Sequence, residues 1–270
     1  MQIHTLTDIT IPELHPYRTL RRSKEQFDNG LFIAESMKVV TRLLESRLRV
    51  RTVLISDEWF ERKKEQLRAM DPPPEVYVGP KHVLEEIVGY NLHQGIMALA
   101  EVPPTPSLED ILSSAKRPHL FLAIDDLLNA ENVGMIVRNA RAFGVTCILV
   151  GETSSSPYLR RAVRNSLGNV FFVPILQTQD LASTLRSMSS DHGVSILAAE
   201  SGSEGVSLPS ADLSGDTCLV VGGEDTGIRR VVLQECDSIV EIPMVEGMDS
   251  VNVANATAVC LYEVRRQRGG

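Results

Sequence analysis

One stretch of the sequence, residues 119–150, constrains the fold more than any other, because an apolar run, a helical repeat and a second apolar run follow closely there. The first run, His119 to Ile124, has the composition of a buried strand. Apolar residues then recur at 3.6-residue spacing from Asn132 to Phe143, which predicts a helix that Gly144 ends. Val145 to Val150 predicts the next strand. Strand, helix and strand in this order form a crossover unit, so we expect an α/β fold with a parallel sheet.

The same alternation continues on both sides of this unit. Downstream, a helix is predicted from about Asn252, and four apolar runs predict strands at Val170–Val173, Val194–Ala199, Cys218–Val221 and Ser238–Ile242. Upstream, helices are predicted after a Ser36 cap, from Asp57 and from Pro80, between strands at Leu31–Ala34, Val53–Ser56, Val76–Val78 and Ile96–Ala100. These upstream elements predict a small α/β unit of their own.

Three prolines within four residues mark the clearest candidate domain boundary in the chain, at Val102-Pro103-Pro104-Thr105-Pro106-Ser107. Proline lacks the backbone N–H and has a fixed φ, so this stretch can neither continue a helix nor pair in a central strand. We therefore expect a first domain over residues 1–102, a linker over 103–117 with a short helix from about Leu108 to Ala115, and a second domain over 118–270. A chain of 270 residues is long enough for two such domains.

Charge is distributed unevenly across this boundary. The net charge of −8 divides into −1 over residues 1–117 and −7 over the rest. This balance excludes a generally basic nucleic-acid coat but not a local basic patch. Because basic residues bunch in the first part, for example at Arg18, Arg21, Arg22 and Lys24, that part is the better candidate for an anionic partner. An ordinary solvated surface explains the same residues equally well.

Cysteine use and hydropathy favour a cytosolic protein without a membrane segment. Cys147, Cys218, Cys236 and Cys260 have no C-x-x-C spacing, so we expect reduced thiols, mostly in the core. The first residues lack the pattern of a secretory signal, and no apolar stretch approaches the roughly 20 residues of a membrane helix. Neither H-E-x-x-H nor a paired His/Cys set is present, so a metal site is not expected.

Glycines cluster late in the chain, at Gly222-Gly223-Glu224-Asp225-Thr226-Gly227, directly after a predicted strand. A Rossmann dinucleotide site needs its glycines after the first strand, and a P-loop needs Lys-Ser/Thr where Ile228-Arg229 stand. Ligands in open α/β sheets bind beyond the carboxyl ends of strands. The late loop is therefore the expected wall of a pocket, with its backbone N–H groups open to a ligand.

Polar residues that suit a site occur in three separate segments. The first is Asn132-x-Gly134-x-x-x-Arg138, the second is Gly222-x-Glu224-x-x-Gly227, and the third runs from Ile242-Pro243-Met244 to Ser250-Val251-Asn252. Taken singly, each segment also fits an ordinary helix cap or tight turn.

Together the three segments resemble the motifs of the SpoU family, the RNA ribose 2′-O-methyltransferases within the SPOUT superfamily. The resemblance extends over residues 118–270 and, more loosely, to Gly30-Leu31-Phe32-Ile33-Ala34-Glu35-Ser36 and His93-Gln94-Gly95-Ile96, which look like that family's L30e-like RNA-binding domain. Two positions depart from the family pattern, Val251 and Ala254, where Leu and Ser are usual.

The resemblance implies the architecture and the reaction. The fold would be a parallel-sheet SPOUT domain with a deep trefoil knot, preceded by the small L30e-like α/β domain, in a homodimer. The reaction would transfer a methyl group from S-adenosylmethionine to a ribose 2′-hydroxyl of structured RNA, rRNA more than tRNA. The family pattern assigns catalysis to Asn132, Arg138, Glu224, Ser250 and Asn252, and cofactor binding to Gly222, Gly223, Ile242, Met244 and Val251.

The chemistry of arginine favours a role for Arg138 in binding a phosphate over a role as the general base. The guanidinium pKa of about 12.5 or above makes arginine a poor general base, whereas its charge suits a phosphate next to the reacting alcohol. RNA phosphates would also contact the basic residues Arg18, Arg21, Arg22, Lys24, Arg160, Arg161 and Arg164.

Two other kinds of protein compete with this interpretation. A non-catalytic RNA-binding protein could share the fold, although the chain has all five polar residues of the family site. A small-molecule α/β enzyme with a nucleotide cofactor is disfavoured by the missing early glycines and by the separate first domain.

Overall fold

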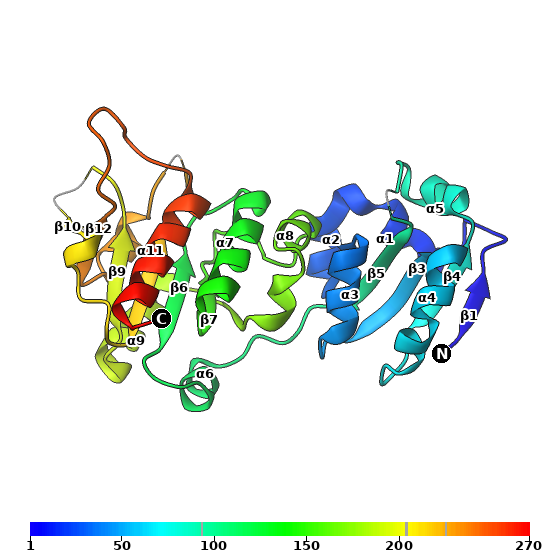
Figure 1. Cartoon of the computed structure of the whole chain (residues 1–270), viewed down its shortest axis with the longest axis horizontal. Helices are drawn as coiled ribbons and strands as arrows, with labels where there is room; N and C mark the ends of the chain where they lie inside the picture. The colour runs from blue at the N-terminus through cyan, green and yellow to red at the C-terminus, as the bar shows by residue number, and fades with distance from the viewer. Residues whose placement is uncertain (93, 203–204, 225) are drawn as a thin grey trace. The chain divides into compact units, whose positions relative to one another are not determined.

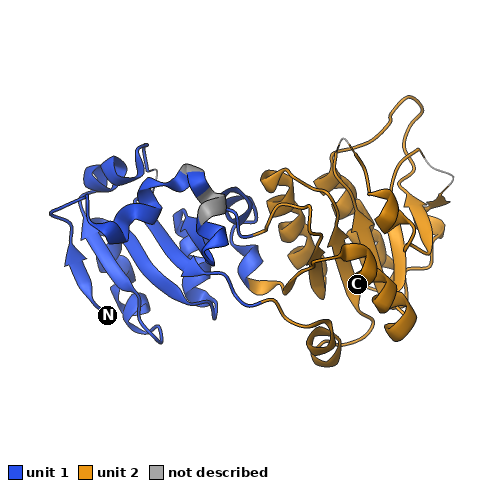
Figure 2. Ribbon diagram, turned by 180° about the vertical axis from the view of Figure 1, so that it is seen from behind, with its two compact units in different colours: residues 1–104, 158–171 blue, residues 105–157, 172–270 orange. Residues whose placement is uncertain are grey.

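The computed structural model describes residues 1–92, 94–202, 205–224 and 226–270 (Figure 1). Position 93 of the second first-domain motif and position 225 of the glycine cluster therefore lie outside the described residues. The chain forms two units (Figure 2): residues 1–104 with 158–171, and residues 105–157 with 172–270. The first division falls in the proline-rich stretch. Residues 158–171, which we expected in the second domain, are grouped with the first unit.

A seven-stranded sheet, parallel throughout, forms the centre of the second unit. Its order is β10-β12-β9-β11-β6-β7-β8, so β6, the first of these seven strands along the chain, lies inside the sheet. The bounds are β6 Leu120–Ile124, β7 Cys147–Val150, β8 Ile175–Gln177, β9 Ser195–Ala199, β10 Val206–Ser207, β11 Thr217–Val221 and β12 Ser238–Glu241. Nearly unbroken apolar runs such as Leu120–Ile124 suit strands that are covered on both faces.

Helices cover both faces of this sheet. One core combines alternate strand residues with α6 (Leu108–Ser114), α9 (Leu181–His192) and α10 (Arg230–Leu233). The other face carries α7 (Ala130–Phe143) and α11 (Val253–Gln267), which lie side by side (Figure 1). The Asn139 amide donates to the Ala254 carbonyl oxygen at 2.8 Å between these two helices. The prediction of an α/β fold with a parallel sheet is confirmed for this unit.

One predicted strand is wrong. Val170–Val173 was expected to be extended, but residues Asn169–Phe172 form a 3₁₀ turn, and the strand follows as β8. The turn closes on itself through the Phe171 N–H, which donates to the Gly168 carbonyl at 3.3 Å. A run of four apolar residues contains too little periodicity to distinguish a strand from a buried turn.

The first unit is built on a five-stranded mixed sheet of order β1-β4-β3-β5-β2. Its strands are β1 Ile3–Thr5, β2 Leu31–Glu35, β3 Val50–Ser56, β4 Glu75–Gly79 and β5 Ile96–Glu101. Its helices are α1 His15–Arg18, α2 Ser23–Asp28, α3 Met37–Glu45, α4 Asp57–Arg68, α5 Lys81–Val88 and α8 Arg160–Asn165. Further 3₁₀ segments among the described residues are Pro12–Leu14 and Leu20–Arg22 in this unit and Leu208–Ser210 in the second.

The start of α3 differs from the predicted serine cap. Ser36 precedes the helix at φ 84°, and its side chain accepts no capping hydrogen bond. Instead, the Met37 N–H donates to Oε1 of Gln94 at 2.7 Å, so a residue 57 positions further along the chain satisfies the helix end.

Candidate active site

The carboxyl ends of neighbouring parallel strands meet at one edge of the second unit's sheet. β12, β9, β11 and β6 are adjacent and run in the same direction. The chain leaves these strands into the segments that start at residues 125, 200, 222 and 242. All three motifs of the sequence therefore lead away from the edge where parallel sheets bind ligands.

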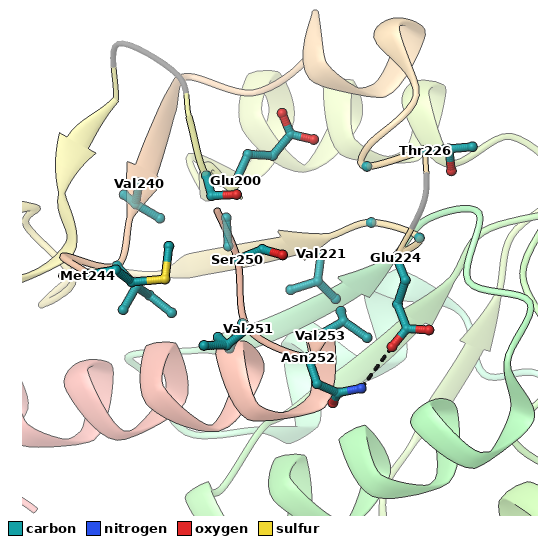
Figure 3. A pocket seen from close by; sticks show the side chains of 17 residues that line it. Glu200, Val221, Glu224, Thr226, Val240, Met244, Ser250, Val251, Asn252 and Val253 are labelled. Atoms are coloured by element: carbon teal, nitrogen blue, oxygen red, sulfur yellow. Dashed lines mark hydrogen bonds between the residues drawn. The ribbon is translucent and has the colours of Figure 1, made fainter. Parts of the chain in front are cut away.

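Hydrogen bonds join the three motifs directly. Oε1 of Glu224 accepts from Nδ2 of Asn132 at 2.6 Å and from Nδ2 of Asn252 at 2.8 Å. Asn252 Nδ2 also lies 3.2 Å from Oδ1 of Asn132, which accepts from it. We call these three residues the polar trio; Figure 3 shows its Glu224–Asn252 bond. One carboxylate oxygen thus fixes two amides that come from different parts of the chain.

Helix capping places both amides. Asn129, not Asn132, caps α7, because its Oδ1 accepts from the N–H groups of Glu131 at 2.9 Å and Asn132 at 3.3 Å. The Asn132 side chain, in a residue only 6% exposed, is therefore free to reach Glu224. Asn252 caps α11 by accepting from the Ala254 N–H at 3.0 Å, and this leaves its Nδ2 for the trio.

The glycine loop, residues 222–228, closes on itself. The N–H of Gly223 donates to the Gly227 carbonyl at 3.1 Å, and the N–H of Gly227 donates back to Gly223 at 3.0 Å. A Cβ on Gly222 would lie 2.2 Å from the Gly227 carbonyl carbon. These glycines therefore serve close packing of the backbone, and the N–H groups of Gly223 and Gly227 are engaged within the loop rather than open to a ligand.

An ion pair holds the end of this loop. Asp125, which is fully buried, accepts from the backbone N–H of Arg229 at 2.8 Å and from its Nε at 2.8 Å. Nη1 of Arg229 lies 2.6 Å from Oε1 of Glu152. The hydrogen bonds that Arg229 donates to Asp125 and then to Glu152 raise its pKa further above the ordinary value. The sequence reasoning did not identify this anchor, because its members lie far apart in the chain.

A cavity of about 510 Å³ opens beside the glycine loop and the polar trio. Five of its lining residues are the predicted cofactor contacts Gly222, Gly223, Ile242, Met244 and Val251. Glu224, Ser250 and Asn252 of the predicted catalytic set also line it, and Asn132 joins them through Glu224. The structure thus brings together nine of the ten residues predicted for catalysis and cofactor binding.

The cavity fits an adenosyl group with a positive charge. Its volume falls within the range of about 300–1,000 Å³ that is usual for small-molecule sites. Apolar side chains form one side, where Figure 3 shows Val240 and Met244. Glu200 and Glu224 are the charged groups among the described lining residues, so the site favours a cation and disfavours a phosphate.

Arg138 lies outside this arrangement. It is exposed on α7, six residues after Asn132, which places it on a different face of the helix. Within the part of the chain that the structure describes, no hydrogen bond or ion pair engages its guanidinium. Its prediction as a catalytic residue remains a prediction.

The basic residues predicted to contact RNA belong to the first unit, and their surroundings differ. Arg18 donates to the carbonyls of Ile9 and Ile11, so its guanidinium already holds the chain near the N-terminus. Arg22 is exposed. The side chains of Arg21 and Lys24 lie outside the described part of the structure.

The three arginines of α8 also differ. Arg160 is 20% exposed at its side chain and pairs with Glu35, at 2.7 Å from Nη2 to Oε2. It also donates to the Tyr90 hydroxyl at 2.9 Å. Arg161 and Arg164 are exposed, and Arg164 lies 3.9 Å from Glu35. The charge of Arg160 is therefore balanced within the protein, and Arg161 and Arg164 are the better placed for phosphates.

Comparison with known families decides the identity of this site. Residues 119–262, just over half of the chain, match the SpoU rRNA Methylase family. The chain belongs to that family. The match starts at β6 and contains all three motifs, so the predicted membership is confirmed, and with it an S-adenosylmethionine-dependent RNA methyltransferase.

Individual relatives of this SpoU methyltransferase cover between 70% and 100% of its length. An uncharacterized tRNA/rRNA methyltransferase of Mycobacterium bovis is 30% identical over 277 residues, covering 100% of this chain and 93% of that protein. The 23S rRNA (guanosine-2′-O-)-methyltransferase RlmB of Pasteurella multocida is 32% identical over 193 residues, 70% of this chain and 77% of its own. An AdoMet-bound rRNA methyltransferase structure from Sinorhizobium meliloti has a TM-score of 0.85 at 25% identity and covers 98% of both chains.

Two other features are absent from the described residues of the SpoU methyltransferase. No helix within them has the length and apolar character to cross a membrane. No group of three or more His, Cys, Asp or Glu side chains among them is arranged to hold a metal ion.

Proposed function

We propose that this enzyme methylates a ribose 2′-hydroxyl of structured RNA, in rRNA rather than tRNA. The observation that carries the proposal is the polar trio at the cavity, because it places two amides and a carboxylate beside a site suited to a cationic adenosyl group. The guanosine-2′-O activity in the name of the Pasteurella relative supports the ribose hydroxyl as acceptor and rRNA as the substrate.

The cofactor is assigned to the cavity, with Gly222, Gly223, Ile242, Met244 and Val251 as its walls. S-adenosylmethionine supplies an activated methyl group when it is bound there. The protein's own task is to orient the alcohol and to stabilise the charge that develops on its oxygen. The polar trio performs the first part, because its mutual hydrogen bonds fix its donors and acceptors at the cavity, and Ser250 adds a hydroxyl there.

Arg138 performs the second part from the partner subunit of a homodimer. On α7 it shares an exposed stripe with Met135, which is 40% exposed, and the neighbouring α11 exposes Val259 and Tyr262 at 44% and 58%. Exposed apolar groups around an unpaired guanidinium favour a second copy as the occupant of this face. In the dimer, Arg138 holds the phosphate beside the reacting ribose.

The remaining expectations concern architecture. We propose that the first unit is the L30e-like RNA-binding domain and that the second contains the trefoil knot of its family. The mixed five-stranded sheet with helices supports the first assignment, and membership of the SpoU family supports the second.

Methylation of unmodified transcripts tests the proposed function. The purified chain is incubated with labelled S-adenosylmethionine and with rRNA or tRNA transcribed in vitro, and the RNA is digested to nucleosides for mass spectrometry. We expect 2′-O-methylnucleosides from rRNA. Label on a base contradicts the ribose assignment. RNA binding without any transfer indicates the non-catalytic alternative, and tighter binding of NAD than of S-adenosylmethionine indicates the nucleotide-dependent one.

A further inference from the structure

Glu200 is a cavity residue that belongs to none of the three motifs. It follows β9 directly, and its side chain lines the cavity together with the glycine loop. Figure 3 shows Glu200 and Asn252 on different sides of the cavity. Glu200 is therefore separate from the polar trio, although both contribute carboxylates to the same space.

The structure fixes the Glu200 carboxylate through one of its oxygens. Oε1 accepts from the backbone N–H of Ile228 at 2.7 Å. A Cβ on Gly227 would lie 2.7 Å from the same Oε1, so the glycine at position 227 provides room for the carboxylate. The carboxylate is thus held against the glycine loop in one orientation.

The other oxygen, Oε2, has no hydrogen bond or ion pair with any residue that the structure describes. Glu200 as a residue is half-buried and borders the cavity. A hydrogen bond from a ligand to a carboxylate oxygen in such a position stabilises the complex. Oε2 is therefore the atom of Glu200 that can accept a hydrogen bond from a ligand in the cavity.

We propose that Glu200 binds the ribose hydroxyls of the adenosyl cofactor. The proposal rests on the proposed assignment of the cofactor to this cavity. The apolar side around Val240 and Met244 suits the adenine ring, and the polar trio lies at the reacting end. The ribose lies between these two parts of the molecule, and its vicinal hydroxyls are two donors that match a carboxylate acceptor.

The amino group of the methionine portion is the other donor that could reach a carboxylate. The two ligand groups are separable, because 5′-methylthioadenosine has the ribose but no amino acid. S-adenosylhomocysteine has both. Loss of affinity for both compounds on removal of the Glu200 charge identifies the ribose, whereas loss for S-adenosylhomocysteine alone identifies the amino group.

Calorimetric titration of the full chain tests the proposal without turnover. Glu200→Gln keeps a carbonyl oxygen for the Ile228 N–H but replaces the charged acceptor. A hydrogen bond to a charged group corresponds to about 10–100-fold in affinity, and we expect a loss of about 10-fold for both compounds. Glu109→Gln, on the exposed surface of α6, is the matched control and leaves both affinities unchanged.

Removal of the hydroxyl from the ligand completes the test. We expect the wild-type chain to bind 5′-methylthio-2′-deoxyadenosine about 10-fold more weakly than 5′-methylthioadenosine, and Glu200→Gln to distinguish the two far less. Equal affinities in the wild-type chain overturn the proposal without any substitution, so it stays testable even if the variant does not fold.

The outcomes also distinguish a failure of the role of Glu200 from a failure of the cofactor assignment to the cavity. If the wild-type chain binds neither S-adenosylhomocysteine nor methylthioadenosine, the assignment of the cofactor to the cavity is wrong and Glu200 loses its role with it. If the wild-type chain binds both and Glu200→Gln changes neither affinity, only the role of Glu200 is wrong.

Discussion

The residues predicted for catalysis are of two kinds, and they differ in how the protein holds them. Glu224 and the amides of Asn132 and Asn252 restrain one another through short hydrogen bonds. Arg138 is exposed and has no such partner among the described residues. The trio is therefore preorganised within one chain, whereas Arg138 depends on what binds beside it.

Replacement of Arg138 separates these two contributions. We expect Arg138→Ala to lower kcat by about 10²–10³-fold, because one charge that stabilises the developing alkoxide is lost, while the dissociation constant of S-adenosylmethionine stays unchanged. Arg141→Ala, on the same helix, is the control and retains activity. An equal loss of cofactor binding in Arg138→Ala contradicts its assignment to the RNA phosphate.

Glycine 222 is the residue most restricted by its surroundings. An added methyl group at Gly222 overlaps the backbone of Gly227, so Gly222→Ala displaces the glycine loop and costs about 1–3 kcal/mol in the free energy of unfolding. We expect the cofactor affinity to fall with it. Gly215→Ala serves as the control, because its Cβ meets no atom within 4 Å. Denaturant unfolding and titration calorimetry measure the two effects. An unchanged cofactor affinity in Gly222→Ala contradicts the assignment of Gly222 to the wall of the cofactor site.

At the scale of elements, two helix starts build the site. Asn129 and Asn252 satisfy the first N–H groups of α7 and α11, and each start delivers one amide of the trio. The direction of a catalytic side chain is thereby determined by where its helix begins.

The cap of α7 is testable against a second cap that is remote from the cavity. Asn129→Ala and Asp180→Ala each remove an N-cap acceptor and each lower the free energy of unfolding by about 1 kcal/mol. We expect only Asn129→Ala to lower kcat as well, because only α7 carries Asn132. Equal activities in the two variants contradict the role of this cap.

Elements with a clear period were predictable from the sequence, and local exceptions were not. The apolar spacing from Val133 to Phe143 identified α7, although the helix starts two residues before the predicted Asn132. The run Val170–Val173 lacked any period and was misassigned as a strand. The cap of α3 by Gln94 depends on tertiary structure, which no local pattern contains.

The site was predictable to the extent that motifs mark it. Asn132, Glu224 and Asn252 were identified because their spacing matches a family pattern, and the structure joins them by hydrogen bonds. Glu200 was missed because a single carboxylate after a strand is a common pattern without a motif. The Asp125–Arg229 pair was missed because 104 residues separate its members.

At the scale of the whole molecule, the proposed dimer has a direct test. Val259→Asp introduces a charge into the exposed apolar face of α7 and α11, and we expect it to convert a dimer into a monomer that has lost methyl transfer. Val231→Asp is the matched control, since Val231 is 55% exposed on α10. Light scattering after size exclusion gives the mass, and a monomeric wild-type chain contradicts the dimer.

RNA binding by the first unit is testable through the dependence of the affinity on salt concentration. If arginines there contact phosphates, the logarithm of the affinity falls linearly with the logarithm of the salt concentration, by roughly 0.7–0.9 per contact. We expect Arg161→Ala to reduce that slope by about one. Arg160→Ala lowers stability instead, because it leaves the buried Glu35 without its main partner. A slope unaffected by Arg161→Ala contradicts the phosphate contact.

The oxygen that Glu224 shares with two amides makes evolutionary change at three distant positions interdependent. Because each member of the trio bonds both of the others, a replacement at 132, 224 or 252 removes two of its three hydrogen bonds. A replacement at one position alone is therefore penalised, and we expect related proteins to keep or lose the three residues together.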